Sequence, residues 1–258
     1  AHFDRWPLED RYKEAHVAKV MDCNWKVAQE AFMEAFHVVA THPQLLPSLG
    51  DAISQYDVFG NFCRAISPNG VPSPHVTWEP SQQDIFDAMS DRNLDEEPKA
   101  VVPEGETARH LAAESARSSL RPAIGARADD LCDAELTESI YYTVFPNFHP
   151  WGAYNRIVYR FRPYGNDHRR SIMECMFLSP FTGERPPAAP IHWLTDDDDW
   201  TVATELGMLG RVFNQDVYNL PEVQAGLEAM IKPGVTFADY QETKPRHFHA
   251  ILDEWIAK

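Results

Sequence analysis

The stretch NWKVAQEAFMEAFHVVATHP occupies residues 24–43 and combines a helical pattern with two histidines. Its apolar residues recur every three or four positions, which is the spacing of one face of an α-helix. Asn24 is a suitable N-cap for such a helix, and Pro43 follows it. The stretch therefore predicts a helix over residues 24–40.

Acidic and histidine side chains lie close together on this predicted helix. Glu30, Glu34 and His37 are at positions i, i+4 and i+7, so they share one helical face. His42 follows His37 by five residues, which places the two side chains about 140° apart around a regular helix. They can bind one metal ion only if the helix ends, or widens into a π-turn, between them, and Pro43 favours an ending. We therefore expect a break between His37 and His42.

Asp216 is a carboxylate within an otherwise apolar helical pattern. It follows Leu209 by seven residues, Val212 by four and Phe213 by three. An ionised carboxylate that faces a core is costly unless it is paired or binds a metal. Asp216 could therefore complete a metal site, pair with an arginine such as Arg211, or cap a helix end. The two histidines, in turn, are either metal ligands or hydrogen-bonded core residues.

Three segments, in this order, resemble the α-subunit catalytic domain of Rieske ring-hydroxylating oxygenases. The first is the stretch over residues 24–43, with its NWK start, its ExxH motif and a second His five residues on. The second is VFPNF at 144–148, followed by the strand pattern IVYRFRP at 157–163. The third is FNQD at 213–216, with Gln224 and Gly226 downstream. Together the three segments span most of the chain.

The resemblance implies both a fold and a site. The fold is α+β of the helix-grip type, in which a curved antiparallel β-sheet wraps around a long helix, with flanking helices and an apolar cavity. His37, His42 and Asp216 would bind one Fe(II) ion and leave positions for O2 beside the substrate. Glu34 stands at the place of the family's bridging acid. That acid connects an iron-binding histidine to a histidine on the Rieske 2Fe-2S cluster of a neighbouring subunit.

The sequence departs from the family pattern in two ways. Ring-hydroxylating members often carry Asp at the position of Glu34 and Asn at that of Ala31, so the chain resembles the branch that includes homotrimeric monooxygenases and demethylases. The CxH and CxxH motifs of a Rieske cluster are absent from the sequence. We therefore expect the N-terminal Rieske domain to be missing from this chain, which begins without Met. The cluster is expected on that domain or on a neighbouring subunit.

The predicted function is an Fe(II)-dependent oxygenase that activates O2 to hydroxylate an aromatic or other cyclic apolar substrate. Five apolar side chains are expected to line the substrate pocket, although each could equally be ordinary core: Phe32, Val38, Leu209, Val212 and Phe213. One alternative is a Rieske-type monooxygenase or demethylase of a more polar compound. The other is a non-catalytic helix-grip domain that binds an apolar ligand, in which the histidines are polar core residues.

The remaining patterns indicate one domain over residues 1–258. Alternating apolar residues predict strands over 55–66, 138–145, 154–163 and 170–178, with a turn at 146–153. Helical patterns follow at 199–219, 221–231 and 244–257, with Pro221 at a first helical position. Strands between helical segments are typical of an α+β fold. Residues 90–135 are rich in charged and small residues, which predicts either a mobile lid or a solvated insertion.

Composition restricts the partners. The formal net charge of −16 disfavours nucleic acid or an anionic membrane as the main partner. The four cysteines are far apart, which indicates reduced thiols, and neither a signal peptide nor a membrane-spanning pattern is found. We therefore expect a cytoplasmic protein. Its expected partners are a small apolar substrate, O2 and a ferredoxin or flavin reductase, in a homotrimer whose β-subunit is left open.

Overall fold

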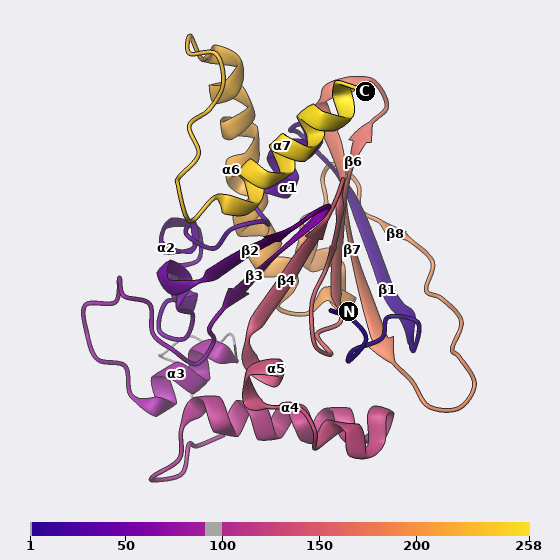
Figure 1. Cartoon of the computed structure of the whole chain (residues 1–258). Helices are drawn as coiled ribbons and strands as arrows, with labels where there is room; N and C mark the ends of the chain where they lie inside the picture. The colour runs from indigo at the N-terminus through magenta and orange to yellow at the C-terminus, as the bar shows by residue number, and fades with distance from the viewer. Residues whose placement is uncertain (1, 91–99) are drawn as a thin grey trace.

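The computed structural model describes residues 2–90 and 100–258. In this part of the chain, eight strands form one curved sheet with the order β2-β3-β4-β5-β6-β7-β1-β8 (Figure 1). The strands are β1 (Arg11–Met21), β2 (Gln55–Phe59), β3 (Phe62–Ser67), β4 (Ser139–Val144), β5 (Phe148–Pro150), β6 (Ile157–Tyr164), β7 (Asp167–Pro180) and β8 (His192–Trp193). Neighbouring strands are antiparallel, except that β1 and β8 are parallel.

Alternation along the strands gives the sheet one apolar face. In β6, Ile157, Tyr159 and Phe161 are buried, whereas the side chains of Arg160 and Arg162 are partly exposed. Successive side chains of a strand point to opposite faces, so the three apolar residues share one face of the sheet. Equivalent residues of β1 and β7 join the same apolar cluster. This face of the sheet bounds the apolar core of the protein.

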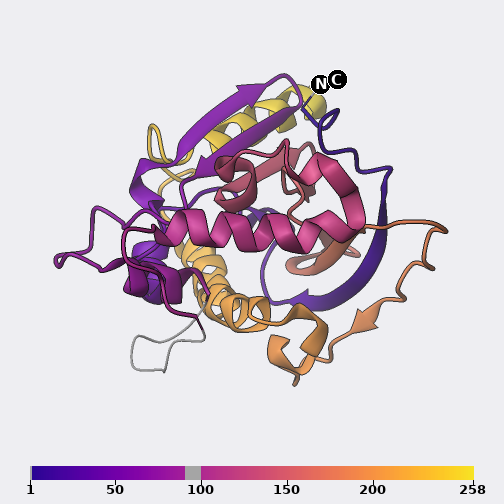
Figure 2. The ribbon, with the colours of Figure 1, turned by 90° about the horizontal axis from the view of Figure 1, so that it is seen from below.

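Four helices lie over this face: α1 (Trp25–Glu30), α2 (Val38–Thr41), α6 (Leu209–Ala229) and α7 (Thr243–Ile256). The main apolar cluster joins Ala28 of α1 and Phe213 of α6 to the sheet. Three further helices lie toward one end of the sheet: α3 (Gln82–Met89), α4 (Ala108–Ile124) and α5 (Asp133–Thr137). Figure 2 shows α4 crossing beneath the sheet. The predicted α+β helix-grip fold is confirmed, with a short parallel strand added at one edge of the sheet.

The helix predicted over residues 24–40 is interrupted earlier than expected. α1 ends at Glu30, turns follow, and α2 contains only four residues. Within the turns, the backbone N–H of Ala35 donates to the hydroxyl of Tyr56, 3.1 Å away on β2. This tertiary hydrogen bond replaces a helical one, and no local pattern could predict it. The expected break between His37 and His42 is present, because α2 ends at Thr41.

Other predicted boundaries also change. The predicted strand 55–66 is a hairpin of β2 and β3, which turns at Gly60 with a φ of 47°. Strand β1 was not predicted, because its Lys and Glu residues obscure the apolar alternation. The helices predicted at 199–219 and 221–231 are one helix, α6, with Pro221 inside it. Pro221 and the two residues after it are exposed, so the proline lies on the solvent side of the helix.

The segment predicted as a lid or insertion is largely helical where it is described. Residues 91–99 lie outside the described residues, and α4 and α5 occupy much of the remainder. Whether this segment moves stays a prediction, as does the single-domain organisation. Among the described helices, none has the length and apolar composition needed to cross a membrane.

Candidate metal centre

The fold brings His37, His42 and Asp216 together. One ligand atom from each residue lies within 4.8 Å of the other two. Asp216 Oδ1 is 2.8 Å from His42 Nε2 and 3.6 Å from His37 Nε2. The side chains of His42 and Asp216 are almost fully buried, whereas that of His37 is 26% exposed. The three residues thus form a compact group with one side nearer to solvent.

The short helix α2 explains how two histidines five residues apart converge. His37 precedes its first residue and His42 follows its last residue. The backbone of His42 has left the helical region, with φ −128° and ψ 54°. The two imidazole rings consequently lie 5.5 Å apart. Asp216 approaches them from the middle of α6, where it faces the interior.

Each imidazole is oriented by a partner on its Nδ1 atom. His37 Nδ1 lies 2.5 Å from Glu34 Oε1, while Glu34 Oε2 accepts the backbone N–H of His37 at 3.1 Å. His42 Nδ1 lies 2.9 Å from Gln215 Oε1, which also accepts from the side-chain amide of Gln44. In both rings Nε2 therefore faces Asp216. Metal-binding histidines are commonly held in this way, because the Nδ1 partner fixes the tautomer and the ring plane.

Gln215 and Gln44 were not identified from the sequence. Gln215 immediately precedes Asp216 in the FNQD segment, and Gln44 follows His42 by two residues. Their proximity to the predicted ligands was the only available signal. Since the bond between them joins η1 (Pro43–Leu45) to α6, only the tertiary structure reveals it.

The electrostatics of the group favour a bound cation. Burial lowers the pKa of His37, but hydrogen bonds to Asp216 and Glu34 and the charges of these carboxylates outweigh it and raise the pKa to about 10. Burial raises the pKa of Asp216, but hydrogen bonds and charge from the two histidines reverse this and lower it. Without a metal, the group therefore holds a proton on His37 at neutral pH. A divalent cation would displace that proton and take over its charge-neutralising role.

The donor set fits a ferrous ion. Two imidazole nitrogens and one carboxylate oxygen lie within 4.8 Å of one another, and this combination of donors is typical of mononuclear non-haem iron with open positions. A second group with similar donors, His110, Glu114 and Asp133, is exposed on α4 and α5. Arg117 pairs with both Glu114 and Asp133, so a cation there already neutralises the carboxylates. Only the first group therefore fits a metal ion.

The predicted pocket residues fall into different environments. The Phe32 ring lies 5.1 Å from Tyr159 and 6.1 Å from Phe213, in the interior beside the metal centre. Val38 is buried, and Leu209 packs against the main apolar cluster. Val212 is half-buried and does not belong to that cluster. The structure thus brings Phe32, Leu209 and Phe213 to one interior region, and their contact with substrate stays a prediction.

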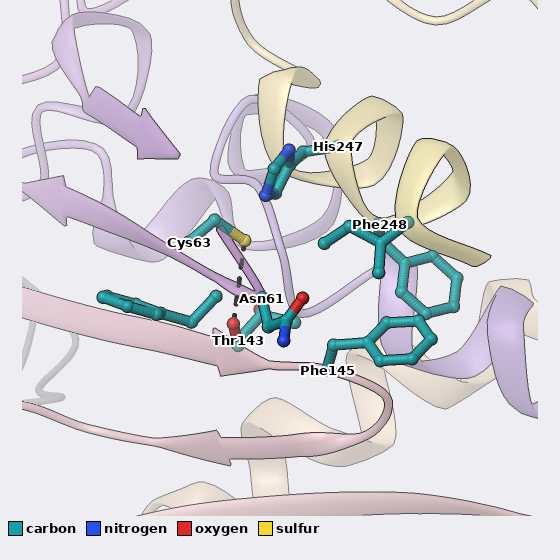
Figure 3. A pocket seen from close by; sticks show the side chains of 8 residues that line it. Asn61, Cys63, Thr143, Phe145, His247 and Phe248 are labelled. Atoms are coloured by element: carbon teal, nitrogen blue, oxygen red, sulfur yellow. Dashed lines mark hydrogen bonds between the residues drawn. The ribbon is translucent and has the colours of Figure 1, made fainter. Parts of the chain in front are cut away.

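Two hollows lie elsewhere on the molecule. A cavity of about 10 Å³ between α7 and strands β3 and β4 could hold about one water molecule (Figure 3). An open depression of about 350 Å³ is lined by polar and charged residues that include Arg169, Arg170 and Gln224. Neither hollow is lined by a residue of the metal centre or of the predicted pocket.

Two solved structures, both with TM-scores above 0.5, support the fold. The chain matches the quaternary ammonium Rieske monooxygenase CntA bound to an inhibitor, with a TM-score of 0.52 and 14% identity over 96% of this chain and 50% of that one. A second CntA structure gives a TM-score of 0.51 and 14% identity over 96% of this chain and 51% of that one. A naphthalene 1,2-dioxygenase variant bound to phenanthrene gives 0.45 and 17%, over 93% and 52%. The chain thus spans about half the length of these proteins.

The family assignment rests on the sequence profile. No curated protein matches the chain. The profile described as the ring hydroxylating alpha subunit (catalytic domain), in contrast, matches residues 3–258, which is nearly the whole chain. This family implies an oxidoreductase with mononuclear non-haem iron, in agreement with the donor set described above. The chain therefore belongs to the family of catalytic domains of ring-hydroxylating oxygenase α-subunits.

Proposed function

We propose that this chain is the oxygen-activating part of an Fe(II)-dependent oxygenase that hydroxylates an aromatic or other cyclic substrate. The observation that carries the proposal is the convergence of His37, His42 and Asp216, with Nδ1 of both imidazoles already held by a partner. Such an arrangement is preorganised for a metal, because the partner on Nδ1 fixes each ring with Nε2 toward Asp216. A ferrous ion bound there would supply the site of O2 activation.

The protein's own residues would provide geometry and an entry for electrons. Asp216 and His42 would hold the ion from the buried side, and the partly exposed ring of His37 would face the outside. Glu34 links to this ring through the 2.5 Å contact at Nδ1. We assign Glu34 as the residue that passes electrons from a Rieske cluster to His37, as the bridging acid does in the family.

A neighbouring subunit would supply that cluster. Two apolar side chains beside His37, those of Phe36 and Val39, are about 40% exposed. Exposed apolar groups at the electron entry suit coverage by another protein surface. We therefore propose a homotrimer in the cytoplasm, with a Rieske domain of one subunit packed beside Glu34 of the next and a ferredoxin or flavin reductase as donor.

The substrate proposal rests on the interior beside the metal centre. Aromatic rings of Phe32, Tyr159 and Phe213 meet there, and they suit a flat, cyclic compound. A second candidate is monooxygenation or demethylation of a more polar compound. Glu34, which replaces the Asp found in many ring-hydroxylating members, favours this candidate.

Iron binding tests the proposed site. Protein reconstituted anaerobically with Fe(II) is expected to retain about one iron per chain after desalting, and Asp216→Ala is expected to lose it because the only carboxylate ligand is gone. Asp133→Ala, at the exposed second group, is the matched control and should retain iron. Retention of iron by Asp216→Ala, or no iron in the parent, would contradict the proposal. Absence of iron would leave the non-catalytic ligand-binding domain as the better description.

A further inference from the structure

Trp151 is a partly buried residue that packs against two apolar clusters of the sheet. It follows β5 and pairs with Tyr141 of β4 through an isolated bridge. Its ring lies 5.6 Å from that of Tyr141 and 6.3 Å from that of Tyr159. Tyr159 in turn contacts Phe32 of the segment after α1 and Phe213 of α6. Trp151 therefore belongs to the aromatic wall that faces the helices carrying the metal centre.

Two tyrosines of this wall are affected by charges at the metal centre. Burial raises the pKa of the Tyr159 phenol well above its usual value, and the charge of Asp216 contributes to the rise. Burial likewise raises the pKa of Tyr141, to which the charge of Glu34 contributes. The two tyrosines that flank Trp151 thus lie within electrostatic reach of a predicted iron ligand and of the bridging acid. Trp151 lies between them.

The indole N–H of Trp151 is buried and has no hydrogen-bond partner among the residues that the structure describes. Buried donors in folded proteins are almost always paired, so an isolated one needs an explanation. Indole nitrogen can only donate, so the absent partner must be an acceptor. Two of the contacts of Trp151 are with aromatic rings, which cannot serve as conventional acceptors, and a molecule bound against this wall would supply the oxygen that the indole N–H lacks.

Gln29 presents a second unpartnered group on the helical side. Its side-chain oxygen lies 3.2 Å from His149 Nε2, while its amide nitrogen is buried without a partner. Burial and the charge of Lys244 lower the pKa of His149 to about 3, so its ring is neutral and its other nitrogen contacts Thr143. Reversing the Gln29 amide would leave its oxygen unpaired instead. In either orientation of the amide, one polar atom of the Gln29 side chain therefore has no hydrogen-bond partner among the described residues.

We infer that the substrate carries a carbonyl or carboxylate oxygen on an aromatic or cyclic body, and that the indole N–H of Trp151 binds this oxygen. The inference rests on the proposed oxygenase function and narrows its substrate class from any aromatic or cyclic compound to one that carries such an oxygen. Trp151 is then a specificity-determining residue, because its hydrogen bond fixes the ring of the substrate against the aromatic wall. Gln29 of α1 offers a second polar contact.

Binding of matched probes tests this inference without turnover. Three pairs differ by one carbonyl oxygen each: ethylbenzene and acetophenone, indane and 1-indanone, and tetralin and 1-tetralone. Calorimetric titration of the Fe(II)-loaded chain under nitrogen, without reductant, is expected to show each ketone binding about tenfold more tightly than its hydrocarbon, as expected for one net hydrogen bond. Equal affinities within the pairs, or no binding by any ketone, would overturn the inference. Measurements on the parent protein are sufficient for this test.

Trp151→Phe should remove the preference and leave hydrocarbon affinities within about twofold, because the ring remains and only the donor is lost. The matched control is Trp200→Phe. The indole N–H of Trp200 is also buried and unpartnered, but its ring contact among the described residues is with Phe213 alone. This control should keep the preference. A preference that survives in Trp151→Phe would assign the oxygen to another donor and overturn the role of Trp151.

The two proposals can fail separately. Iron content is measured on the same preparations, and the titrations are repeated on metal-free protein. A chain that binds no iron but prefers the ketones would disprove the oxygenase function while retaining the donor at Trp151. A chain that binds iron but treats ketones and hydrocarbons alike would retain the oxygenase function and disprove the substrate class.

Discussion

Two groups of the same residue types behave differently in this molecule. His37, His42 and Asp216 converge in the interior, whereas His110, Glu114 and Asp133 lie on exposed faces of α4 and α5. In the interior group, Glu34 and Gln215 hold the outer nitrogens of the imidazoles. In the exposed group, Arg117 already neutralises both carboxylates. Donor atoms at a suitable spacing are therefore insufficient, and burial with oriented rings distinguishes a metal centre from a surface ion-pair network.

The largest difference in metal binding between the two groups is expected when one imidazole is removed from each. His42→Ala is expected to lower Fe(II) affinity by more than about 100-fold, because it deletes a ligand rather than an orienting partner. His110→Ala should leave the affinity unchanged. Competitive titration with a metal-sensitive chelator dye measures both. Similar losses in the two variants would show that the distinction between the groups is wrong.

Glu34→Gln separates iron binding from electron delivery. Glutamine keeps a group of the same shape beside His37, so iron content should remain near that of the parent. In an assay with the Rieske domain and reductase present, turnover should fall at least about tenfold, because the charged link to His37 is lost. Glu114→Gln serves as the exposed control. Equal turnover by Glu34→Gln and the parent would remove Glu34 from the electron path.

Gln215→Leu tests whether orientation of His42 matters. The substitution removes the acceptor from Nδ1 and leaves the ligand itself in place. Loss of such a partner typically weakens metal affinity by about 10–100-fold, and we expect the lower end because Gln215 is uncharged. Glu222→Leu, on an exposed turn of the same helix, controls for the change in α6. An unchanged iron affinity in Gln215→Leu would show that packing alone orients the ring.

The stability of the iron-free chain should depend on pH through His37, whereas bound iron would take the place of the proton on His37 and reduce this dependence. The pKa of His37 is raised to about 10, so its stabilising effect is complete below about pH 6.5 and is lost as pH rises toward 10. The pKa of Asp216 is lowered, so its effect is lost as pH falls below its usual range. The iron-free chain should therefore unfold at progressively lower temperature above pH 6.5, by about 2–4 °C per kcal/mol lost. Thermal melts of His37→Gln should lack that decline.

The smallest effect is expected at the exposed group. Arg117→Met removes two ion pairs with carboxylates that are 49% and 38% exposed. Exposed pairs contribute about 0–1 kcal/mol each, and the hydrogen bond from Arg117 to the backbone carbonyl of Leu131 is lost as well, so the unfolding free energy should fall by about 2 kcal/mol. Iron content should not change. A marked gain in metal binding by Arg117→Met would show that only the arginine kept this group from being a metal site.

Local patterns predicted much of the fold, and their failures have physical causes. The alternation in β6 and β7 was strong enough to locate both strands, because one face of the sheet is buried. The pattern after Asn24 correctly predicted helix but not its early end at Glu30, which the hydroxyl of Tyr56 stabilises from another strand. At Pro221, local propensity predicted a helix start, but α6 continues through the proline, with Leu220 buried before it and Gln224 buried after it.

The sequence by itself determined the types and order of the candidate ligands. Spacing and setting made His37, His42 and Asp216 candidates, and resemblance to the family implied that they form the ligand set and that Glu34 is the bridging acid. Only the tertiary structure decided that α2 is short enough for the two imidazoles to converge, and that Gln215 orients one of them. It also placed the unpaired donor of Trp151 in the aromatic wall. These features depend on contacts between residues far apart in the chain, and such contacts leave no periodic trace in the sequence.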